Sequence, residues 1–590
     1  MRTLLNDNWQ FLKLPPGSTA GQAAAGPWQE VVLPHDWLIG QEDLYESADA
    51  WYRRILVREA GGAPVCMLRF DGVYMDCEVL LNGEIICTHA YGYTAFDADL
   101  TGKLREGENE ILVHIRHQSP NSRWYSGSGI YRDVWLEELP ENHLVRDGFS
   151  FQYKQQDGQW LLRVKAEASR EEPLPFRCVL KDAEGRVAAQ GETDGSGKAL
   201  QAELVIRDAR LWSPESPSLY TLEMTYGAQT EIRKTGIRWT AFDPDRGFFL
   251  NGKNIKLKGV CLHHDLGCLG AAFHEKAARR QLQLMLDMGA NAIRTSHNPP
   301  AEKWLDLCDE MGILVVDEAF DMWEISKTTY DYARFFDDCE EEDVARWVRR
   351  DRIHPCVIMW SVGNEIYDMH AGERGAEITQ MLKDQVERHD PARHARVTFG
   401  CNYMPWEGGQ RCAEIVKVPG YNYGEKLYEA HHRAHPDWVI YGSETASVLS
   451  SRGIYHFPME KSIMSDSDLQ CSALGNSNTS WGASDLREII VNDLNTPYSM
   501  GQFIRSGIDY IGEPTPYHTR SCYFGQADTA CFPKDAYYLF QSLWTDRPML
   551  HIGVIWDWNP GQMIDVPVMS NCSRVELYLN GRRIGAEDVD

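Results

Sequence analysis

Apolar and polar residues alternate with a period of two through roughly the first 243 positions of the chain. The segment CEVLLNGEIICTH contains the dipeptide Asn82-Gly83, which is typical of a hairpin turn, and NEILVHIRH alternates in the same way. The alternation continues in WLLRVKAEA and LYTLEMTYG. Short alternating strands separated by turns predict one β-sandwich over residues 1–145 and a second, smaller β-sandwich over 146–243.

From residue 244 the pattern changes to apolar strands that alternate with amphipathic helices. The helical stretches HEKAARRQLQLMLDMG and AEKWLDLCDEMG end at Gly289 and Gly312, and glycine is the usual residue after a helix. Eight strands with such helices between them predict a parallel β/α barrel over residues 244–555, with an active site at the C-terminal strand ends. The predicted strands are 256–262, 291–295, 313–317, 356–361, 396–400, 415–420, 438–443 and 507–511.

The last segment, residues 556–590, returns to the β pattern. SNCSRVELYLNGRRIG at 570–585 resembles the two opening strands of a further sandwich. The chain ends at Asp590, before such a domain could close, and the open sheet left there would be a liability. We therefore expect an incomplete C-terminal β domain in a truncated chain.

Composition and charge narrow the classes of function. The 590-residue chain has 25% charged and 43% apolar residues, as compact domains do, and a formal net charge of −27. This acidity argues against nucleic acid or an anionic membrane as partner, because both bind clustered Lys and Arg. The N-terminus has no signal-peptide core, and no apolar run approaches ~20 residues. We expect a soluble cytoplasmic protein whose 15 scattered cysteines are reduced.

Two apolar strands of the predicted barrel deliver a glutamate to their C-terminal ends. VIMWSVGNEI delivers Glu365, directly after Asn364, and WVIYGSE delivers Glu444. Two carboxyl groups on one face are what glycosidic bond cleavage requires, one to protonate the leaving oxygen and one to attack or activate water. Taken alone, Asn364 and Glu365 could cap the next helix, and Glu444 could be a satisfied polar turn. Their shared place in the barrel pattern favours catalysis.

Several long motifs resemble glycoside hydrolase family 2, the family of β-galactosidases, β-glucuronidases and β-mannosidases. They are LPHDW at 33–37, NSRWYSGSGIYRDVWL at 121–136, LWSPESPSLY, KGVCLHHDLG, NAIRTSHNPP, RDRIHPCVIMWSVGNE and GSETAS. The resemblance implies a jelly-roll sugar-binding domain, an immunoglobulin-like sandwich and a TIM barrel, in that order. It also implies a retaining mechanism with Glu365 as general acid/base and Glu444 as nucleophile. We expect burial or a nearby carboxylate to raise the pKa of Glu365 above that of Glu444.

The resemblance further implies a set of sugar-pocket residues at the barrel strand ends, namely His263, Arg294, His297, Asn364 and Tyr421. Asn364 would bond the sugar's 2-hydroxyl, and Tyr421 matches the tyrosine that contacts the nucleophile. Arg294 could instead orient a neighbouring carboxylate, and Tyr421 could be a packing residue. Asp317 and Glu318 resemble a magnesium-binding region, but Met322 stands where those relatives have a carboxylate. We expect neither a metal nor a cofactor.

Arg505 departs from the family pattern, in which a tryptophan of the sugar pocket ends the eighth strand. An arginine there could weaken a pocket for a neutral sugar, read the carboxylate of a uronide, or turn away from the sugar. The loop YHTRSCYFGQ at 517–526 lacks the Asn-x-Lys motif with which β-glucuronidases of the family grip that carboxylate. The segments DYIGEPTPY, YFGQAD and FPKD most resemble the β-galactosidase branch.

We therefore predict a retaining exo-β-glycosidase that hydrolyses terminal β-D-galactosides. A β-glucuronidase or β-galacturonidase is the alternative with the same mechanism, because Arg505 and Arg520 are cations that could bind the carboxylate of a uronide substrate. A catalytically weak carbohydrate-binding protein is the alternative from another class. The expected partner is a small carbohydrate substrate. Large enzymes of this architecture often self-associate, although no residue here specifies a homo-oligomer.

Overall fold

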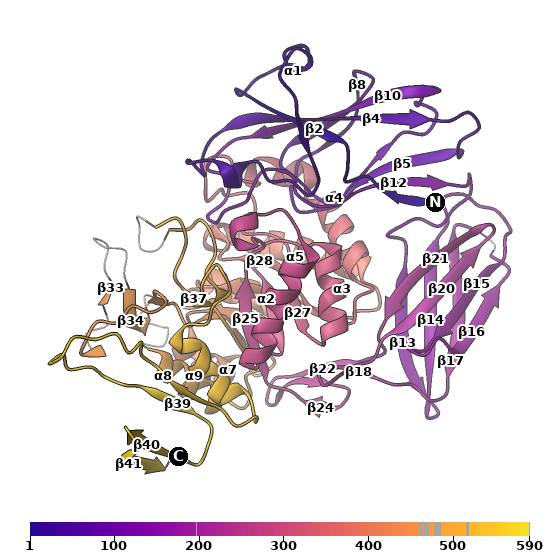
Figure 1. Cartoon of the computed structure of the whole chain (residues 1–590). Coiled ribbons are helices and arrows are strands. Elements are labelled where there is room, and N and C mark those ends of the chain that lie inside the picture. Colours follow the sequence, from indigo (N-terminus) through magenta and orange to yellow (C-terminus); the bar gives the residue numbers. More distant parts are fainter. Residues whose placement is uncertain (196, 460–462, 465–470, 477–484, 515–518, 589–590) are drawn as a thin grey trace.

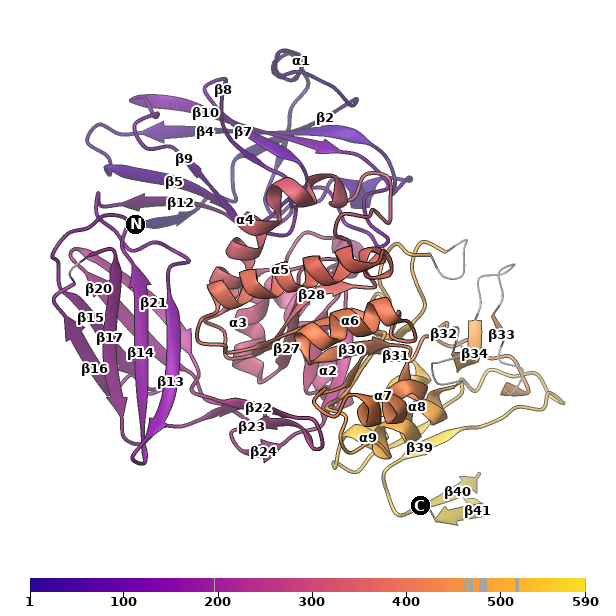
Figure 2. The same cartoon turned by 180° about the vertical axis from the view of Figure 1, so that it is seen from behind.

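The computed structural model describes residues 1–590 except 196, 460–462, 465–470, 477–484, 515–518 and 589–590. A barrel occupies the centre, one β-sandwich covers its upper side and a second sandwich stands beside it (Figure 1; the view from behind is Figure 2). The predicted multidomain order of two sandwiches followed by a TIM barrel is confirmed.

The first sandwich consists of two antiparallel sheets. The predicted Asn82-Gly83 turn joins strands β7 (Cys77–Leu81) and β8 (Glu84–His89), and both residues have positive φ, as this hairpin turn requires. The longest strands, β4 (Ala48–Arg58) and β10 (Gly107–His117), pair along eleven residues each. One sheet has the order β1 (Arg2–Leu4), β12 (Val134–Leu139), β5 (Val65–Phe70), β9 (Phe96–Asp99); the other has the order β3 (Gln29–Val31), β2 (Trp9–Leu14), β4 (Ala48–Arg58), β10 (Gly107–His117), β7 (Cys77–Leu81), β8 (Glu84–His89).

The second sandwich has a hydrophobic core of its own. In β17 (Ala199–Ile206) exposed and buried residues alternate at every position, so the sequence pattern translates directly into one inner and one outer face. Its sheets have the orders β13 (Ser150–Gln156), β14 (Gln159–Glu167), β17 and β16 (Val187–Thr193), β15 (Phe176–Lys181), β20 (Tyr220–Tyr226), β21 (Gln229–Thr235). A small sheet, β22 (Thr240–Asp243), β23 (Gly247–Leu250) and β24 (Lys253–Asn254), leads into the barrel.

Eight parallel strands close the barrel. They are β25 (Leu257–Leu262), β26 (Ala292–Thr295), β27 (Leu314–Glu318), β28 (Val357–Asn364), β29 (Arg396–Cys401), β30 (Pro419–Asn422), β31 (Tyr441–Thr445) and β35 (Gly501–Ile504). The predicted eighth strand at 507–511 was wrong. Residues Ser506–Ile508 form β36, which pairs with β37 (Gly525–Ala527) outside the barrel. The true strand begins at Gly501, whose φ of 127° brings it against the backbone of Leu257.

Helices surround the barrel, and the predicted helix ends at Gly289 and Gly312 are confirmed. Both glycines adopt the left-handed conformation that terminates a helix. The predicted strand at 415–420 lies two to four residues too early, because the helix before it continues to Val416. The helices around the barrel are α2 (Glu275–Met288), α3 (Glu302–Met311), α4 (Ala333–Asp351), α5 (Glu373–His389), α6 (Glu407–Val416), α7 (Tyr428–Ala434), α8 (Leu486–Leu494) and α9 (Asp535–Trp544).

The first sandwich and the barrel share one continuous hydrophobic cluster, whereas the second sandwich has a separate cluster. Polar contacts reinforce this joint. Asp36 accepts hydrogen bonds from Tyr125 Oη at 2.6 Å within the sandwich and from Ala271 N at 2.9 Å in the barrel. Arg132 donates to the carbonyl oxygen of Pro299 at 2.9 Å. The sandwich is therefore fixed on the barrel, and its loops can serve a site at the barrel mouth.

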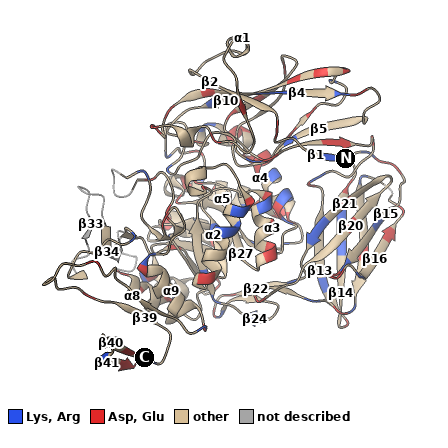
Figure 3. Cartoon of the chain, in the orientation of Figure 1, with Lys and Arg blue, Asp and Glu red and all other residues tan. Residues whose placement is uncertain are grey.

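The C-terminal segment contains two short antiparallel pairs. The first joins β38 (Leu550–Ile552) to β39 (Val568–Ser570), and the second joins β40 (Arg574–Leu579) to β41 (Arg582–Asp588). Lys and Arg lie among Asp and Glu on both sandwiches and on the barrel helices (Figure 3). Within the described residues, no helix has the length and apolarity needed to cross a membrane.

Candidate active site

The structure places both predicted carboxylates at the C-terminal end of the barrel. Glu365 directly follows β28, and Glu444 lies in β31. Glu365 has a φ of 47°, in the left-handed region that a glutamate rarely adopts, and its N–H donates to the carbonyl oxygen of Gly400 at 2.8 Å. One hydrogen-bonded network links the two carboxyl groups, running from Glu365 through Asn422, Asn364 and Arg294 to Glu444.

Glu444 is held at both carboxylate oxygens. Arg294 Nη1 donates to Oε2 at 3.0 Å, and Arg505 Nη1 donates to Oε1 at 2.9 Å. The hydroxyl of Tyr423 also donates to Oε1. Glu444 is buried, with 3% of its surface exposed, so these charged donors compensate a carboxylate that water barely reaches. The arrangement fixes its position and orientation.

Arg294 lies beneath the site and is fully buried. It forms a bidentate ion pair with Glu318, with the shortest N–O distance at 2.7 Å, and donates to Asn364 Oδ1 at 2.8 Å. Glu318 is in turn bonded to His297 Nδ1 at 2.6 Å. Burial, and then Arg294, lower the pKa of His297 well below its usual value, so the imidazole is neutral. The geometry therefore supports the alternative considered for Arg294 from the sequence, in which this residue orients neighbouring carboxylates.

Glu365 is surrounded by donors. Asn422 Nδ2 lies 3.0 Å from Oε1, and Arg123 Nη1 lies 3.4 Å from Oε2. Burial alone would raise the pKa of Glu365, but Arg123, Lys327 and the Asn422 hydrogen bond together lower it below its usual value. The expected rise in this pKa is therefore wrong, because the sequence does not show that two cations, Arg123 and Lys327, lie near this carboxyl group.

Several residues of the site were missed by sequence reasoning. Arg123 comes from the first sandwich and forms a bidentate pair with Asp321, with one N–O distance of 2.7 Å. Lys327 Nζ lies 2.8 Å from the same carboxylate. Arg123 stands in the family-like motif at 121–136, but no local pattern shows that a loop of one domain enters the site of another. The residues missed are Arg123, Asp321, Lys327, Asn422, Tyr423 and Glu513.

Asn364 contacts the network through both ends of its amide. Its Nδ2 donates to Asp321 Oδ1 at 2.9 Å, and its Oδ1 accepts from Arg294 and Asn422. The alternative that Asn364 and Glu365 cap the next helix is wrong. The 3₁₀ helix η3 (Tyr367–His370) begins after Ile366 and has no side-chain cap.

Tyr421 does not contact the nucleophile candidate, contrary to the prediction. Its hydroxyl is 2.9 Å from Nδ1 of His431, outside the strand ring, and the side chain is fully buried. Neighbouring side chains on a strand point to opposite faces, so Asn422 points into the barrel while Tyr421 points toward α7. Tyr423, with a φ of 52° just beyond the strand, turns back to bond Glu444. Both tyrosines stand in the motif GYNYGE, which does not distinguish them.

His263 and Arg505 form one wall of the site. His263 stacks on Tyr510 with ring centroids 3.5 Å apart. Arg505 contacts Glu444 and also pairs with Glu513 at 2.9 Å, so the reading in which it turns away from the site is wrong. In the loop 517–526, residues 517 and 518 lie outside the described residues, and Arg520 donates to the carbonyl oxygen of Gln41 at 3.4 Å.

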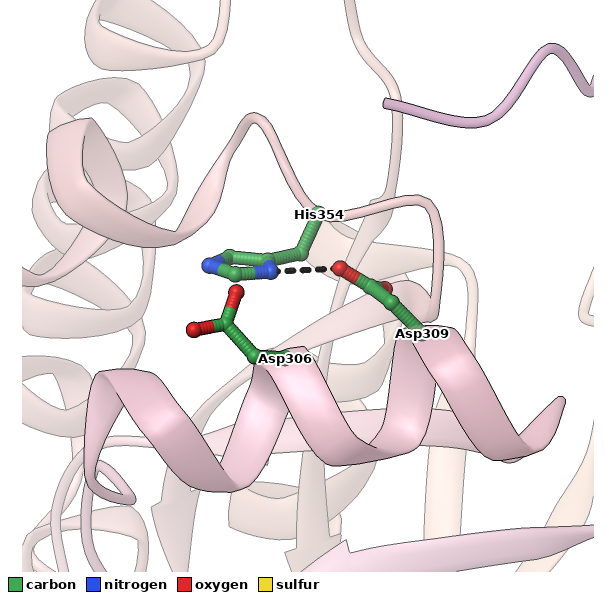
Figure 4. A group of neighbouring side chains, drawn as sticks. All are labelled: Asp306, Asp309 and His354. Atoms are coloured by element: carbon green, nitrogen blue, oxygen red, sulfur yellow. Dashed lines mark hydrogen bonds and ion pairs between the residues drawn. The ribbon is translucent and has the colours of Figure 1, made fainter. Parts of the chain in front are cut away.

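Glu318 lies in the segment that resembles a magnesium-binding region, and its carboxylate oxygens are bonded to other side chains. Glu318 is saturated by Arg294, His297 and Ser361. Among the described residues, one group has metal-like spacing, and it lies at the other end of the barrel strands: Asp306, Asp309 and His354 (Figure 4). Both oxygens of Asp309 are occupied there, one by Nδ1 of His354 at 2.7 Å and one by the N–H of Cys356 at 2.9 Å.

The charge of His354 also opposes metal binding. Burial disfavours the protonated imidazole, but Asp309 and its hydrogen bond raise the pKa of His354 to about 9. An imidazolium has no lone pair to offer a metal. The pair instead ties α3 to the segment that enters β28, the strand that Glu365 directly follows.

Comparisons with known proteins match the two sandwiches and the barrel. The model "Glycosyl hydrolases family 2, TIM barrel domain" matches residues 244–432, "Glycosyl hydrolases family 2, sugar binding domain" matches 42–140, and "Glycosyl hydrolases family 2" matches 145–238. A domain of unknown function, DUF4982, matches 561–590.

Relatives named as beta-galactosidases and relatives named as beta-glucuronidases are both similar in sequence to the whole chain. Beta-galactosidase BoGH2A of Bacteroides ovatus is 37% identical over 100% of this chain and 77% of its own length. A putative beta-glucuronidase of Formosa agariphila is 30% identical over 100% of this chain and 60% of its own length. The crystal structure of a beta-glycosidase from Bacteroides vulgatus has a TM-score of 0.87 at 30% identity, covering 100% of this chain and 81% of that chain.

Replacing Arg123 by glutamine removes a cation that lowers the pKa of Glu365, so that pKa rises. We expect the alkaline limb of kcat/KM for an alkyl glycoside to move to higher pH by about one pH unit. Arg170→Gln, which changes an exposed arginine of a surface ion pair, serves as the control and leaves the limb in place. A limb that stays in place or moves to lower pH in Arg123→Gln would contradict the assignment.

Replacing His354 by alanine leaves the buried Asp309 carboxylate unpaired and should cost about 3–5 kcal/mol of stability. Because the folded-state pKa of His354 is raised to about 9, the ionic part of this loss is complete below about pH 6.5 and fades as pH rises through 9. Thermal midpoints of both proteins from pH 6 to 10 measure the difference. Asp306→Asn, at an exposed position, should cost far less. An equal loss at every pH would refute the charged pair.

Proposed function

Because the chain belongs to glycoside hydrolase family 2, we propose that it is a retaining exo-β-glycosidase that hydrolyses terminal β-D-galactosides. The observation that carries this proposal is the pair of carboxylates at the barrel mouth. Glu444 is fixed by Arg294, Arg505 and Tyr423, as a nucleophile must be. Glu365 lies at the end of another strand, among hydrogen-bond donors and cations.

Each carboxylate has a defined step in this mechanism. Glu444 attacks the anomeric carbon while Glu365 transfers its proton to the leaving oxygen, so a glycosyl ester forms and the alcohol departs. Glu365 is then ionised, and Arg123 and Asn422 stabilise that form. Water next loses a proton to Glu365 and attacks the anomeric carbon, which releases the sugar and restores Glu444. The configuration is retained after two inversions.

The charge balance of the site supports a neutral sugar. Arg505, the cation best placed to read a uronide, already pairs with Glu444 and Glu513. The contacts described above join the four cations Arg123, Arg294, Lys327 and Arg505 to the five carboxyl groups of Glu318, Asp321, Glu365, Glu444 and Glu513. A further carboxylate would add negative charge to this network and would be repelled.

One observation favours a β-glucuronidase or β-galacturonidase as the second candidate. Nε of Arg505 is buried and has no hydrogen-bond acceptor among the described residues, and the carboxylate of a uronide is one group that could supply that acceptor. The relative from Formosa agariphila carries the name of a beta-glucuronidase. A catalytically weak carbohydrate-binding protein is disfavoured, because binding alone does not need two carboxylates that are each held by an arginine.

Replacing Glu444 by alanine should abolish turnover while the fold remains, because no glycosyl ester can form. Circular dichroism and the thermal midpoint check the fold. Azide or formate should restore part of the activity on an activated aryl galactoside and yield the galactosyl product of inverted configuration, which NMR identifies. The matched control Glu42→Ala changes a glutamate outside the carboxylate network and should hydrolyse normally. Retained activity in Glu444→Ala would exclude it as the nucleophile.

A panel of nitrophenyl β-galactoside, glucuronide, galacturonide and mannoside tests the sugar. We expect wild type to hydrolyse the galactoside best, and Arg505→Met to lower its kcat/KM roughly 10–100-fold, because one hydrogen bond to the charged Glu444 is lost. Arg505→Lys should retain more activity because it keeps the charge. If wild type prefers a uronide and Arg505→Met removes that preference, the result supports the β-glucuronidase or β-galacturonidase alternative instead. Activity on no glycoside in the panel would favour the binding protein.

A further inference from the structure

Three aromatic side chains contact one another at the rim of the barrel, and a fourth, Tyr367, lies within electrostatic reach of one of them, Tyr403. We call Tyr367, His370, Tyr403 and Trp406 the rim cluster. The first two belong to η3, and the last two lie between β29 and α6. The ring of His370 lies 4.1 Å from that of Tyr403 and 5.1 Å from that of Trp406, measured between centroids. Tyr367 is 43% exposed and Trp406 44%, so the cluster presents aromatic surface to solvent.

Close packing of the two loops holds the rim cluster in place. A Cβ added to Gly408, at the start of α6, would collide with the carbonyl oxygen of Met369 in η3. An ion pair between Arg411 and Glu373 joins α6 to α5. The aromatic surface is therefore formed before any ligand arrives, which lowers the entropic cost of binding.

The rim cluster lies on the side of the site that holds the acid/base group. β28 and β29 are neighbours, and the N–H of Glu365 bonds to the carbonyl oxygen of Gly400 at the end of β29. Lys327, which donates to the carbonyl oxygen of Asn364, lies 5.7 Å from the ring centroid of Tyr367. Burial and then the charge of Glu365 raise the pKa of Tyr403, which shows that its phenol lies within electrostatic reach of that carboxylate.

The side that holds the acid/base group is the side on which the leaving group departs. A general acid must be within hydrogen-bond reach of the oxygen that it protonates, so the group attached to that oxygen extends past Glu365. Glu444 lies on β31, and β30 separates that strand from β29. The rim cluster therefore flanks the path of the aglycone.

We propose that the rim cluster is the aglycone site and that it binds a second sugar ring, with the flat C–H face of that ring stacked on Trp406 and Tyr367. Stacking on aromatic rings suits this face of a pyranose, which is apolar, while its hydroxyl groups point outward to water. The inference rests on the proposed glycosidase function and deepens it. It makes the protein an enzyme for disaccharides or longer glycans with a terminal β-linked sugar.

Three galactosides that differ only in the aglycone test the proposal: a galactosyl-glucose disaccharide, methyl β-galactoside and phenyl β-galactoside. For Trp406→Ala we expect kcat/KM on the disaccharide to fall roughly tenfold, with the methyl galactoside unchanged. Comparing variant with wild type for each substrate removes differences in leaving-group basicity. Trp239→Ala is the matched control, because this tryptophan is 41% exposed and lies between the second sandwich and the barrel. Tyr367→Ala should repeat the effect.

The outcomes separate the possible failures. A loss on the disaccharide alone, or on the disaccharide and phenyl galactoside together, supports stacking of a ring at this site. A loss on phenyl galactoside alone overturns the sugar assignment. An equal loss on methyl galactoside shows a structural role, and no loss on any substrate shows no role, so both overturn the proposal. If wild type hydrolyses no β-galactoside, the proposed function fails instead, and the same aglycone series with the sugar preferred in the panel still decides the role of the rim cluster.

Discussion

Arg294 is fully buried at the centre of the barrel, and its guanidinium is shared between Glu318 and Glu444. A buried cation is tolerated only when it is paired and hydrogen-bonded on all sides, and removing one partner from such a pair costs about 3–5 kcal/mol. Asn364 supplies a further acceptor for the guanidinium. The nucleophile candidate, the amide beside the acid/base group and the buried Glu318 therefore cannot move independently. The geometry of the site follows from this one charge.

The first sandwich completes what the barrel begins. Its hydrophobic core is continuous with that of the barrel, so the loop that carries Arg123 has a fixed height above the strand ends. Arg123 pairs with Asp321 and reaches Glu365. A barrel without this sandwich would keep the nucleophile network but lose a cation that controls the acid/base group. The two domains thus form one catalytic unit, whereas the second sandwich has its own core.

Local sequence patterns predicted the fold and the position of the two carboxylates at the strand ends. The Asn82-Gly83 turn and the helix ends at Gly289 and Gly312 are local signals, and the structure has each of them where it was predicted. The eighth strand was misplaced, because a four-residue strand that begins with glycine carries little signal. Strand alternation could have separated Tyr421 from Asn422, but the backbone reversal at Tyr423 has no sequence signature.

Contacts between domains and between strands explain the remaining errors. The lowered pKa of Glu365 depends on Arg123 and Lys327, which precede Glu365 by 242 and 38 positions in the chain. Arg123 belongs to the first sandwich, and Lys327 lies in the loop after β27. The pairing of Arg505 depends on Glu513, in the segment that follows β36. Residue types at strand ends predict that polar groups meet. They do not predict which charges balance, because that depends on distances that only the folded chain defines.

The charges around Glu365 and Glu444 also connect the two chemical steps. In the proposed mechanism, Glu444 becomes neutral when it forms the glycosyl ester, and Glu365 becomes an anion when it gives up its proton, so negative charge moves from one side of the network to the other. Arg294 and Arg505 serve the first location, and Arg123 serves the second. Both locations have a cation before the reaction starts, so the protein does not need to reorganise as charge moves. An acid whose ionised form is stabilised in this way donates its proton readily, and a smaller fraction of it is protonated at neutral pH.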